Sequence, residues 1–424
     1  MDRLRHDTDA LIIGGGPAGI AAACAAAQSG RRAPIVDDNP EAGGQIWRGA
    51  KREAASKQAA IWLKRAQDAD VRFIRGARVF HQPEAGRLLA ETASEVYELA
   101  HKKLILATGA RERFLPFPGW TLPNVFGAGG LQALVKSGMP IEGKRVVIAG
   151  SGPLLLAVAA YLKKRGADIL LIAEQARRRR VLGFAISLLG QPEKSAQAMG
   201  LKLKLRGVPY LTDCWPVAAM GDGKLSRVTL RRGSLTWSVA CDYLACGFHL
   251  VANLELAMLL GCEIEDGKAR VNEFQETSIK GTFCAGEATG IKGLESAIVE
   301  GQIAGYAAAG NLDQARRLFS SRDRLRRFAT RLDRAFSLRD ELKSLAAAET
   351  IVCRCEDVSF ERLQEHDSWR LARLQTRCGM GPCQGRVCGP AVEFLFGWET
   401  QSARPPVFPA RVRSFAHMTR GEIR

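Results

Sequence analysis

Short apolar runs alternate with longer alanine-rich or amphipathic stretches along most of this chain. The run TDALII is followed by the alanine-rich stretch AGIAAACAAAQSG, and APIVDD is a second apolar run. Short apolar runs between helical stretches are typical of parallel strands that helices cover on both faces. We therefore expect an α/β fold, with a first strand over residues 8–13 and a helix directly after the glycine turn.

The same order of elements returns between Lys144 and Glu174. KRVVIAG predicts a strand, PLLLAVAAYLKKRG predicts a helix, and ADILLIAE predicts a second strand. A repeated strand–helix–strand unit with a glycine turn after its first strand predicts a second Rossmann-like domain.

A further helix is expected in an arginine-rich stretch late in the chain. Nine arginines lie between Arg316 and Arg339, and the whole chain carries 61 Lys and Arg against 44 Asp and Glu, a net charge of +17. The apolar residues of this stretch recur at helical spacing and are Leu325, Phe328, Leu332, Ala335 and Phe336. We expect a helix with one buried stripe and a basic face turned to solvent or to a partner. Nucleic acid is the alternative partner for this charge, but the sequence contains no recognised nucleic-acid module, so we expect none.

The first apolar run ends in a glycine turn that predicts a dinucleotide site. Gly14, Gly16 and Gly19 have G-x-G-x-x-G spacing, with Pro17 and Ala18 between the second and third glycines. The three glycines permit a tight turn, a close approach of the backbone to a pyrophosphate, and close packing of helix on strand. The helix that follows then directs its N-terminal amides at the phosphate charge.

A carboxylate stands where the ribose of a dinucleotide needs one. Asp37 ends the second strand, 23 residues after Gly14, and Asp38 is the adjacent alternative. A carboxylate at about this distance typically accepts hydrogen bonds from the ribose hydroxyls. Strand, glycine turn, helix, second strand and acid follow in the order of a dinucleotide-binding fold, so we expect a bound nucleotide here.

The second Rossmann-like unit departs from this fingerprint at one position. Gly150 and Gly152 match the first two glycines and Glu174 ends the second strand, but Leu155 stands at the third glycine position. Glu174 favours the unphosphorylated ribose of NAD over that of NADP. Leucine at position 155 compromises the close approach of helix and strand. Three possibilities stay open for this fold: NAD, another adenine nucleotide, or no ligand.

The eleven cysteines form a scattered group and a late cluster. Six lie in apolar sequence, where buried thiols are expected, and these are Cys24, Cys214, Cys241, Cys246, Cys262 and Cys284. The other five lie in the segments VCRCE and TRCGMGPCQGRVCGP. Because the N-terminal sequence MDRLRHDTDALIIGGG has no cleavable apolar segment, this cluster predicts a metal site rather than disulfides. Thiolates on glycine-bearing turns suit either zinc or a [2Fe-2S] cluster.

Three further phrases resemble the flavoprotein family that has two dinucleotide-binding domains. They are PEAGGQIW, LILATGARER and GTFCAGEATGIKGLESAIVEGQIAG. The resemblance implies that the first site binds FAD. It places Gly44 and Gln45 along the flavin, Gly109 over the adenine side, and Gly286 with Glu287 at the ribityl chain. The family usually has aspartate where this sequence has Glu287, which is longer by one methylene group.

The late cysteine cluster resembles the [2Fe-2S] module of the bacterioferritin-associated ferredoxin type. The phrases that carry this resemblance are the C-x-C pair and TRCGMGPCQGRVCGP. The resemblance implies that Cys353, Cys355, Cys383 and Cys388 ligate the cluster and that Cys378 is a fifth, non-ligating thiol.

The order of these parts resembles one subunit of heteromeric amine-oxidising dehydrogenases. This family includes the flavoprotein subunits of opine oxidase, D-hydroxyproline dehydrogenase and hydrogen cyanide synthase, and GGQIWR and ATGARERFLPFPGW support the match. The resemblance implies a partner subunit similar to glycine or D-amino-acid oxidases, which oxidises the amine or imino acid. A small iron–sulfur subunit, an FMN between subunits, and a quinone or dye as acceptor are also compatible with it. The alternatives are a hydrogen cyanide synthase subunit that acts on glycine and a self-contained NADH-dependent reductase.

The same resemblance implies a division of the chain into domains. The expected order is an FAD domain, an inserted second Rossmann-like domain, the return of the FAD domain, a basic helical linker, and an iron–sulfur domain with the C-terminal tail. The expected boundaries are 1–120, 121–250, 251–312, 313–349 and 350–424.

No residue of this chain is assigned to substrate chemistry. The six histidines are dispersed, and His249 has no partner that one sequence can identify, so the catalytic residues are unknown. Apolar runs are interrupted by glycine, charge or proline before they could span a bilayer. We expect a cytoplasmic protein, with peripheral attachment to a membrane if a quinone is the acceptor.

Overall fold

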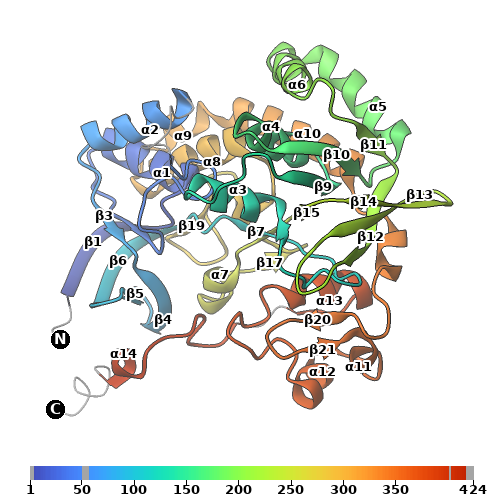
Figure 1. The fold of residues 1–424 in the computed structure, drawn as a ribbon. Coiled ribbons are helices and arrows are strands. Elements are labelled where there is room, and N and C mark those ends of the chain that lie inside the picture. Colours follow the sequence, from blue (N-terminus) through green and yellow to red (C-terminus); the bar gives the residue numbers. More distant parts are fainter. Residues whose placement is uncertain (1–3, 50–56, 401–402, 417–424) are drawn as a thin grey trace. The chain divides into compact units, whose positions relative to one another are not determined.

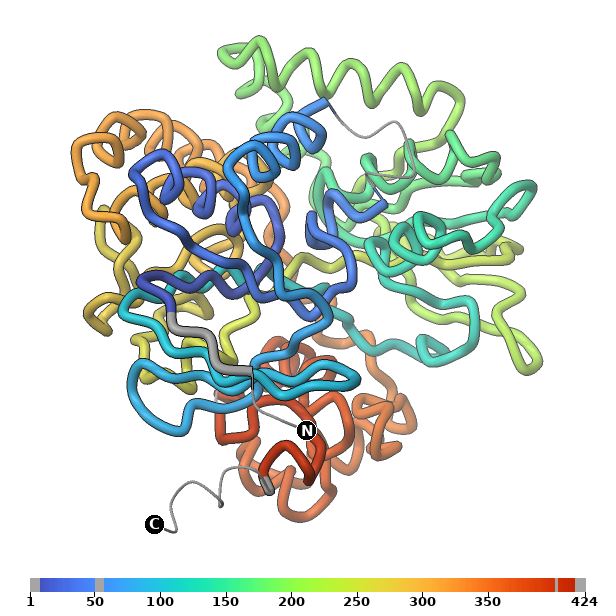
Figure 2. The backbone as a smooth tube through the Cα atoms, turned by 90° about the vertical axis from the view of Figure 1, so that its left-hand side faces the viewer, coloured from blue at the N-terminus to red at the C-terminus, as the bar shows by residue number. Residues whose placement is uncertain are grey.

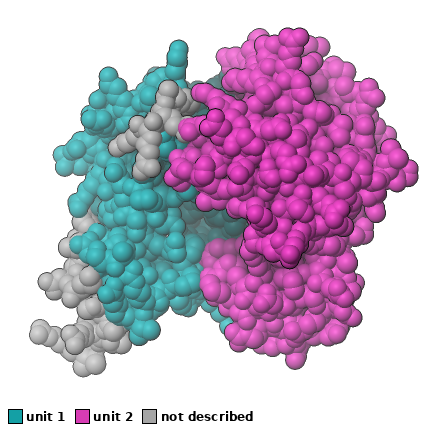
Figure 3. All heavy atoms as spheres, viewed as in Figure 1, with its two compact units in different colours: residues 1–111, 251–329, 402–424 teal, residues 112–250, 330–401 magenta. Residues whose placement is uncertain are grey.

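The computed structural model consists of two compact units (Figure 3). The described residues are 4–49, 57–400 and 403–416. Unit 1 comprises residues 1–111, 251–329 and 402–424, and unit 2 comprises residues 112–250 and 330–401. A Rossmann-like sheet lies in each unit, and residues 112–250 interrupt the first. The prediction of an α/β fold with the second Rossmann-like domain inserted in the first is confirmed.

The sheet of unit 1 has β1 near its centre. Strands β3, β2, β1 and β6 are parallel neighbours, and Ile13 of β1 pairs with both Val36 and Leu106. β19 adds to β6 in parallel, whereas β5 and β4 extend the sheet in antiparallel pairing. The strands are β1 (Leu4–Ile13), β2 (Ile35–Asp37), β3 (Phe73–Arg75), β4 (Arg78–Glu84), β5 (Arg87–Glu91), β6 (Val96–Leu106) and β19 (Thr282–Cys284).

Two helices of unit 1, α1 and α8, pack at very short range beside this sheet (Figure 1). A Cβ atom at Gly301 of α8 would lie 2.2 Å from the carbonyl oxygen of Ala18, and one at Gly305 would lie 2.2 Å from that of Ala22. Glycine is therefore required at both positions. The helices that lie wholly in unit 1 are α1 (Pro17–Gln28), α2 (Lys57–Asp68), α7 (Glu255–Leu259), α8 (Leu294–Ala308), α9 (Leu312–Arg316) and α14 (Val412–Ala416), with the 3-10 turn η2 (Gly286–Thr289).

Unit 2 has a parallel sheet in the order β11, β10, β9, β15, β8 and a separate antiparallel sheet of β12, β13 and β14. Its helices α5 and α6, light green in Figure 2, contribute no buried residue. The strands are β8 (Val125–Gly127), β9 (Arg145–Ser151), β10 (Asp168–Glu174), β11 (Tyr210–Thr212), β12 (Cys214–Met220), β13 (Arg227–Arg232), β14 (Leu235–Ala240) and β15 (Tyr243–Phe248). The helices are α3 (Ala128–Lys136), α4 (Leu154–Lys164), α5 (Arg178–Ser187), η1 (Leu188–Gly190) and α6 (Pro192–Lys204).

The cysteine-rich end of the chain forms a small core of its own within unit 2. Val352, Val358, Leu363, Trp369 and Val392 are buried together in it. Trp120 joins this core to the rest of unit 2, because its indole nitrogen donates to the carbonyl oxygen of Ile351 at 2.5 Å. The elements are η3 (Asp340–Ser344), β20 (Ile351–Cys353), β21 (Val358–Ser359), α11 (Phe360–Gln364), α12 (Trp369–Thr376) and α13 (Cys388–Phe396).

The predicted basic helix is α10 (Phe319–Phe336), which leads into the cysteine-rich core. Ala335 and Phe336 at its end are buried, and Leu325, Phe328 and Leu332 are half-buried, so the predicted apolar stripe is confirmed. The short strands outside the two main sheets are β7 (Ala110–Glu112), β16 (Leu250–Ala252), β17 (Ile264–Glu265) and β18 (Lys268–Ala269). No helix in the described part of the chain has the length and apolarity to cross a bilayer.

Candidate functional site

The glycine turn after β1 is closed so tightly that side chains are excluded at two of its positions. Gly14 has a φ of +112°, and a Cβ atom on it would lie 2.1 Å from the carbonyl oxygen of Ala107, which follows β6. A Cβ atom on Gly19 would lie 1.9 Å from the carbonyl oxygen of Gly14. The turn therefore has the tight geometry that a dinucleotide-binding fingerprint predicts.

The middle glycine of the turn lies against the GGQ segment. The amide of Gly43 donates to the carbonyl oxygen of Gly15 at 2.8 Å. A Cβ atom on Gly44, whose φ is +58°, would lie 3.0 Å from the Cα atom of Gly16. The backbones of Gly16 and Gly44 therefore approach each other closely, while Gln45 is exposed beside them. Such a backbone-lined cradle at the start of α1 fits a pyrophosphate.

The two candidate carboxylates at the end of β2 have different surroundings. Asp37 is buried, and its carboxylate accepts from the amide of Gly15 at 2.7 Å and from the amide and side chain of Asn39. Burial raises its pKa above the usual range. Asp38 is exposed and forms an ion pair with Arg78 at 3.4 Å. Asp37 is therefore the acid that the glycine turn itself positions.

The ATG and late glycine segments both lie in unit 1, where each contacts a neighbouring segment of the same unit. Gly109 follows β6 with a φ of +70°, and its carbonyl oxygen accepts from the amide of Asn253 at 3.0 Å. Gly286 has a φ of +77°, and a Cβ atom on it would lie 2.9 Å from that of Ala18. The segment GEATG therefore reaches the first turn of α1.

Glu287 lies in η2, directly after this contact. Its carboxylate accepts from the amides of Gly293 and Lys292 at 2.9 and 3.2 Å. Burial raises the pKa of Glu287 to about 7. The side chain of Glu287, which is longer than aspartate by one methylene group, thus directs its carboxylate at the amides of the loop before α8.

Glu300 is a buried residue of this region that sequence reasoning missed. It has no exposed surface, and it accepts from the hydroxyl of Thr289 at 2.9 Å and from the amide of Gly286 at 3.3 Å. It also forms an ion pair with Lys292 at 2.8 Å. The only signal in the sequence is a single acid in the apolar stretch SAIVEGQIAG. Glu300 fixes the GEATG turn.

In the second fold, Gly150, Gly152 and Leu155 stand where the repeat predicts them. Gly150 has a φ of +141°, and a Cβ atom on it would lie 2.0 Å from the carbonyl oxygen of Gly247. Leu155 is fully buried, and its Cδ2 atom would lie 3.2 Å from a Cβ atom on Gly247. A glycine on β15 therefore makes the room that the missing glycine of α4 would have provided.

Glu174 ends β10 without any exposed surface. Its carboxylate accepts from the amides of Gly152 and Ala176 at 2.7 and 2.8 Å and lies 3.4 Å from the hydroxyl of Tyr210. Burial raises the pKa of Glu174 to about 7. The carboxylate of Glu174 is therefore hydrogen-bonded to backbone amides of the second fold itself.

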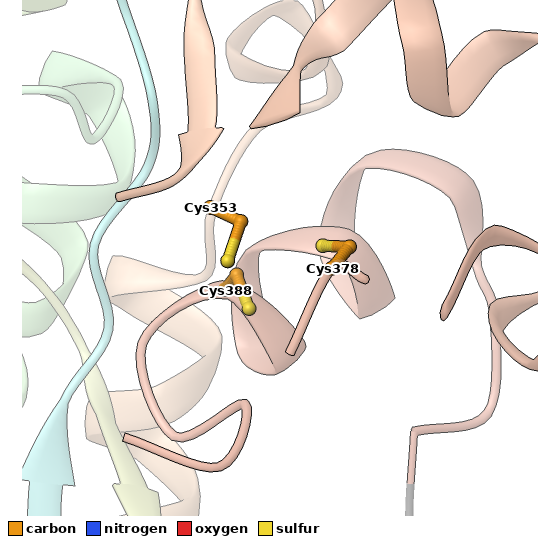
Figure 4. A group of neighbouring side chains, drawn as sticks. All are labelled: Cys353, Cys378 and Cys388. Atoms are coloured by element: carbon orange, nitrogen blue, oxygen red, sulfur yellow. The ribbon is translucent and has the colours of Figure 1, made fainter. Parts of the chain in front are cut away.

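Three of the late cysteines meet in the core of the C-terminal elements (Figure 4). The sulfur atoms of Cys353, Cys378 and Cys388 all lie within 4.8 Å of one another and all three residues are buried. The amide of Gly379 donates to the sulfur of Cys353 at 3.5 Å. Hydrogen bonds from the thiols of Cys378 and Cys388 lower the pKa of Cys353 to about 2. This environment favours a thiolate, the form that ligates metal.

The remaining two late cysteines form a second pair. Cys355 is exposed and Cys383 is half-buried, and both the backbone and the thiol of Cys383 bond to the thiol of Cys355. A Cβ atom on Gly381 would lie 2.3 Å from that of Cys355, so the loop can approach only with glycine there. The resemblance-based ligand set is thus divided: Cys353 and Cys388 lie in the buried group of three, and Cys355 and Cys383 form the second pair. The third member of the buried group is Cys378, which that set does not include.

The chemistry of these five thiols fits a metal centre. A glycine-rich loop with amides directed at sulfur is typical of iron–sulfur sites, where such hydrogen bonds tune the potential. Zinc accepts the same ligands. The six scattered cysteines are buried, as predicted. Cys241 and Cys246 among them have the spacing of a redox dithiol, but burial raises the pKa of both.

This chain is similar to a family of oxidoreductases and to subunits of two enzymes. The pyridine nucleotide-disulphide oxidoreductase family matches residues 8–315. The chain is 31% identical to hydrogen cyanide synthase subunit HcnB of Pseudomonas aeruginosa, over 89% of this chain and 90% of the relative. It is 29% identical to an opine oxidase subunit of Agrobacterium tumefaciens, over 97% of this chain and 92% of the relative.

A solved structure supports the fold along almost the whole chain. L-proline dehydrogenase from P. horikoshii superposes with a TM-score of 0.73 at 18% identity, covering 98% of this chain and 80% of that one. The family and these relatives support an oxidoreductase that uses a flavin. The chain belongs to the pyridine nucleotide-disulphide oxidoreductase family.

Proposed function

We propose that this chain is the electron-relay subunit of a heteromeric dehydrogenase that oxidises an amine or imino acid. The observation that carries the proposal is the presence, on one polypeptide, of a flavin-type nucleotide fold and a buried cysteine cluster. The names of the relatives support it, because one relative is named as a subunit of hydrogen cyanide synthase and another as a subunit of opine oxidase.

Unit 1 offers a cradle for FAD. The closely packed backbone at Gly16 and Gly44 and the N-terminus of α1 would face the pyrophosphate, and Asp37 would face the ribose. By resemblance, Glu287 would lie at the ribityl chain. These groups bind and orient, and no side chain of this chain is assigned a proton transfer.

Unit 2 offers the second redox site. Cys353 and Cys388 are common to the resemblance-based ligand set and to the buried group of three, so these two are the ligands that we assign first. Cys355 and Cys383, or Cys378, complete the set. When both groups are bound, a flavin accepts two electrons together and a [2Fe-2S] cluster carries them singly.

The substrate is proposed to react on another polypeptide. A flavoprotein similar to glycine or D-amino-acid oxidases would oxidise the carbon–nitrogen bond, and this chain would pass the electrons to a quinone or dye. The exposed basic residues of α10, such as Arg324 and Arg327, offer a surface for an acidic partner.

Co-purification tests this proposal. The tagged chain should co-purify with an oxidase-like flavoprotein, and reduction of a dye by an opine or D-hydroxyproline should require both polypeptides. A chain that isolates alone and reduces the dye with NADH would contradict it. The relative named hydrogen cyanide synthase makes glycine the second candidate substrate, and cyanide release from glycine by the same complex distinguishes the two.

A further inference from the structure

The strand order of the unit 2 sheet predicts a nucleotide crevice at the carboxyl ends of its strands. β10 and β11 lie on one side of β9, and β15 and β8 lie on the other, so the strand order reverses between β9 and β15. In open α/β sheets a dinucleotide binds at this reversal. Ser151, Gln175 and His249 stand at the ends of β9, β10 and β15 and therefore mark the crevice.

The carbonyl oxygen of Phe336, the last residue of α10, lies in this crevice. It lies 2.7 Å from the hydroxyl of Ser151, 3.3 Å from the side-chain nitrogen of Gln175, and 2.7 Å from Nε2 of His249. A carbonyl oxygen can only accept a hydrogen bond, so Nε2–H of His249 is the donor. Three strand ends thus donate to one oxygen, in the position where donors would meet a pyrophosphate.

The side chain of Phe336 covers the glycine that a pyrophosphate would approach. Its Cβ and Cγ atoms lie 3.9 Å from the position of a Cβ atom on Gly152. Phe336 is 4% exposed, and its ring packs edge-on against that of Phe184, with 5.4 Å between the ring centres. The backbone approach that the second glycine permits is therefore taken by an aromatic side chain of the same chain.

The residues after Phe336 hold this arrangement in place, and we refer to residues 336–339 as the cover segment. The carbonyl oxygen of Ser337 accepts from the side chain of Gln175 at 3.2 Å, and Arg180 donates to the hydroxyl of Ser337 at 2.7 Å. Arg339 donates to the carbonyl oxygen of Gln175 at 3.2 Å. Its guanidinium also stacks over Trp215, 4.5 Å from the ring centre.

Glu174 stands at the ribose position of the second fold, at the end of β10. The carboxylate of Glu174 has no exposed surface and is held by two amides and near a tyrosine hydroxyl. Asp37 of the first fold accepts from two backbone amides in the same way, so the two carboxylates differ in the complete burial of Glu174 and not in these bonds. Gly150 and Gly152 therefore retain the turn of a dinucleotide fold without an open binding surface.

We propose that the cover segment fills the nucleotide crevice of the second fold and that Phe336 is the residue that excludes NAD(H) and related adenine dinucleotides from it. The second fold then serves to seat the last turns of α10 and the cysteine-rich elements that follow. This inference stands on unit 2 alone and is independent of the electron route proposed above.

A titration with NADH tests the inference on the full-length, flavin-loaded chain. The wild-type protein should show no saturation in calorimetry up to about 1 mM NADH. Phe336→Gly should bind NADH at least about tenfold more tightly than the wild type. Leu332→Gly is the matched control, because it introduces glycine one turn earlier in α10 and in the same apolar cluster. The side chain of Leu332 does not lie over Gly152. The control should leave NADH binding unchanged.

Each outcome decides the inference. Saturation of the wild type at micromolar NADH would overturn it, and so would a folded, flavin-loaded Phe336→Gly protein with no gain in affinity. If the glycine variant does not retain flavin, Phe336→Ala is judged by the same criterion. None of these readouts depends on a cysteine-bound metal or a partner protein, so their failure is distinct from failure of the proposed function.

Discussion

The hydroxyl of Ser151 donates a 2.7 Å hydrogen bond to the carbonyl oxygen of Phe336, although 185 residues separate them in sequence. Ser151 ends the first strand of the second Rossmann-like fold, and Phe336 ends the basic helix that precedes the cysteine-rich elements. The bond therefore ties the start of that fold to a segment much later in the chain.

Removal of this bond has a measurable cost. Ser151→Ala leaves Gln175 and His249 as donors to Phe336, so we expect a loss of about 1 kcal/mol in the free energy of unfolding. Urea denaturation of the purified chain checks this value. Ser234→Ala, at an exposed turn, is the control and should have no effect. Equal stability of both variants would argue against a role for the Ser151 bond.

Close packing of α1 and α8 predicts an unusual response to alanine. Gly301→Ala would place a methyl group 2.2 Å from the carbonyl oxygen of Ala18, so we expect a loss of about 1–3 kcal/mol despite the better helix propensity of alanine. Thermal melts measure the change. Gly183→Ala in α5 has no atom within 4 Å of the new methyl group and should be stabilising by up to about 1 kcal/mol. Stabilisation by both substitutions would contradict the packing described here.

Buried Glu174 makes stability depend on pH. Its pKa is raised from 4.5 to about 7, so the folded state holds a proton that the unfolded state releases. The contribution of Glu174 to stability is therefore complete below about pH 4.5 and is lost as pH rises to about 7, a decline of about 3 kcal/mol for this group. Glu287 has a pKa raised to a similar value and acts with the same sign.

Chemical denaturation at a series of pH values measures this decline. Glu174→Gln removes the titrating group and should make the pH dependence shallower without abolishing it, since Glu287 remains. An unchanged slope in Glu174→Gln would show that the carboxyl group titrates alike in the folded and unfolded states.

The three buried sulfurs predict an order of sensitivity among the cysteines. Cys353→Ser and Cys388→Ser remove ligands that both arrangements share, so each should lose nearly all cysteine-bound iron. Cys378→Ala and Cys355→Ala distinguish the arrangements, because the resemblance-based set needs Cys355 and the buried group of three includes Cys378. Iron content per flavin, with Cys262→Ala as a buried control thiol, provides the measurement.

The outcome decides whether Cys355 or Cys378 ligates the cluster. Iron retained in Cys378→Ala and lost in Cys355→Ala supports the set Cys353, Cys355, Cys383 and Cys388. The reverse result supports ligation by Cys378. Full iron in Cys353→Ser would contradict a cysteine-bound cluster in either arrangement.

Apolar periodicity and glycine turns predicted the helices and strands well, because each of these elements depends on residues close together in the sequence. The apolar run and glycine turn at Gly14 specified a strand, a turn and a helix, and the spacing of Leu325 to Phe336 specified α10. The compensating pair of Leu155 and Gly247 was not predictable, since 92 residues separate a residue on α4 from one on β15. A missing glycine in a motif does not reveal a glycine on the strand that it faces.

Long-range contacts also limited the prediction of the sites. The sequence placed Glu174 in a nucleotide site and left His249 without a role. It could not show that Phe336 lies against the fold that contains both residues. Likewise, cysteine spacing grouped five thiols without separating three buried ones from the Cys355–Cys383 pair. Both facts depend on how distant segments pack, which periodicity does not encode.

Electron paramagnetic resonance of the anaerobic, dithionite-reduced chain tests the central claim most directly. A relay role predicts a yellow protein that, once reduced, gives the signal of a [2Fe-2S] centre at about one spin per flavin. A yellow protein with no such signal and with zinc in place of iron would contradict it.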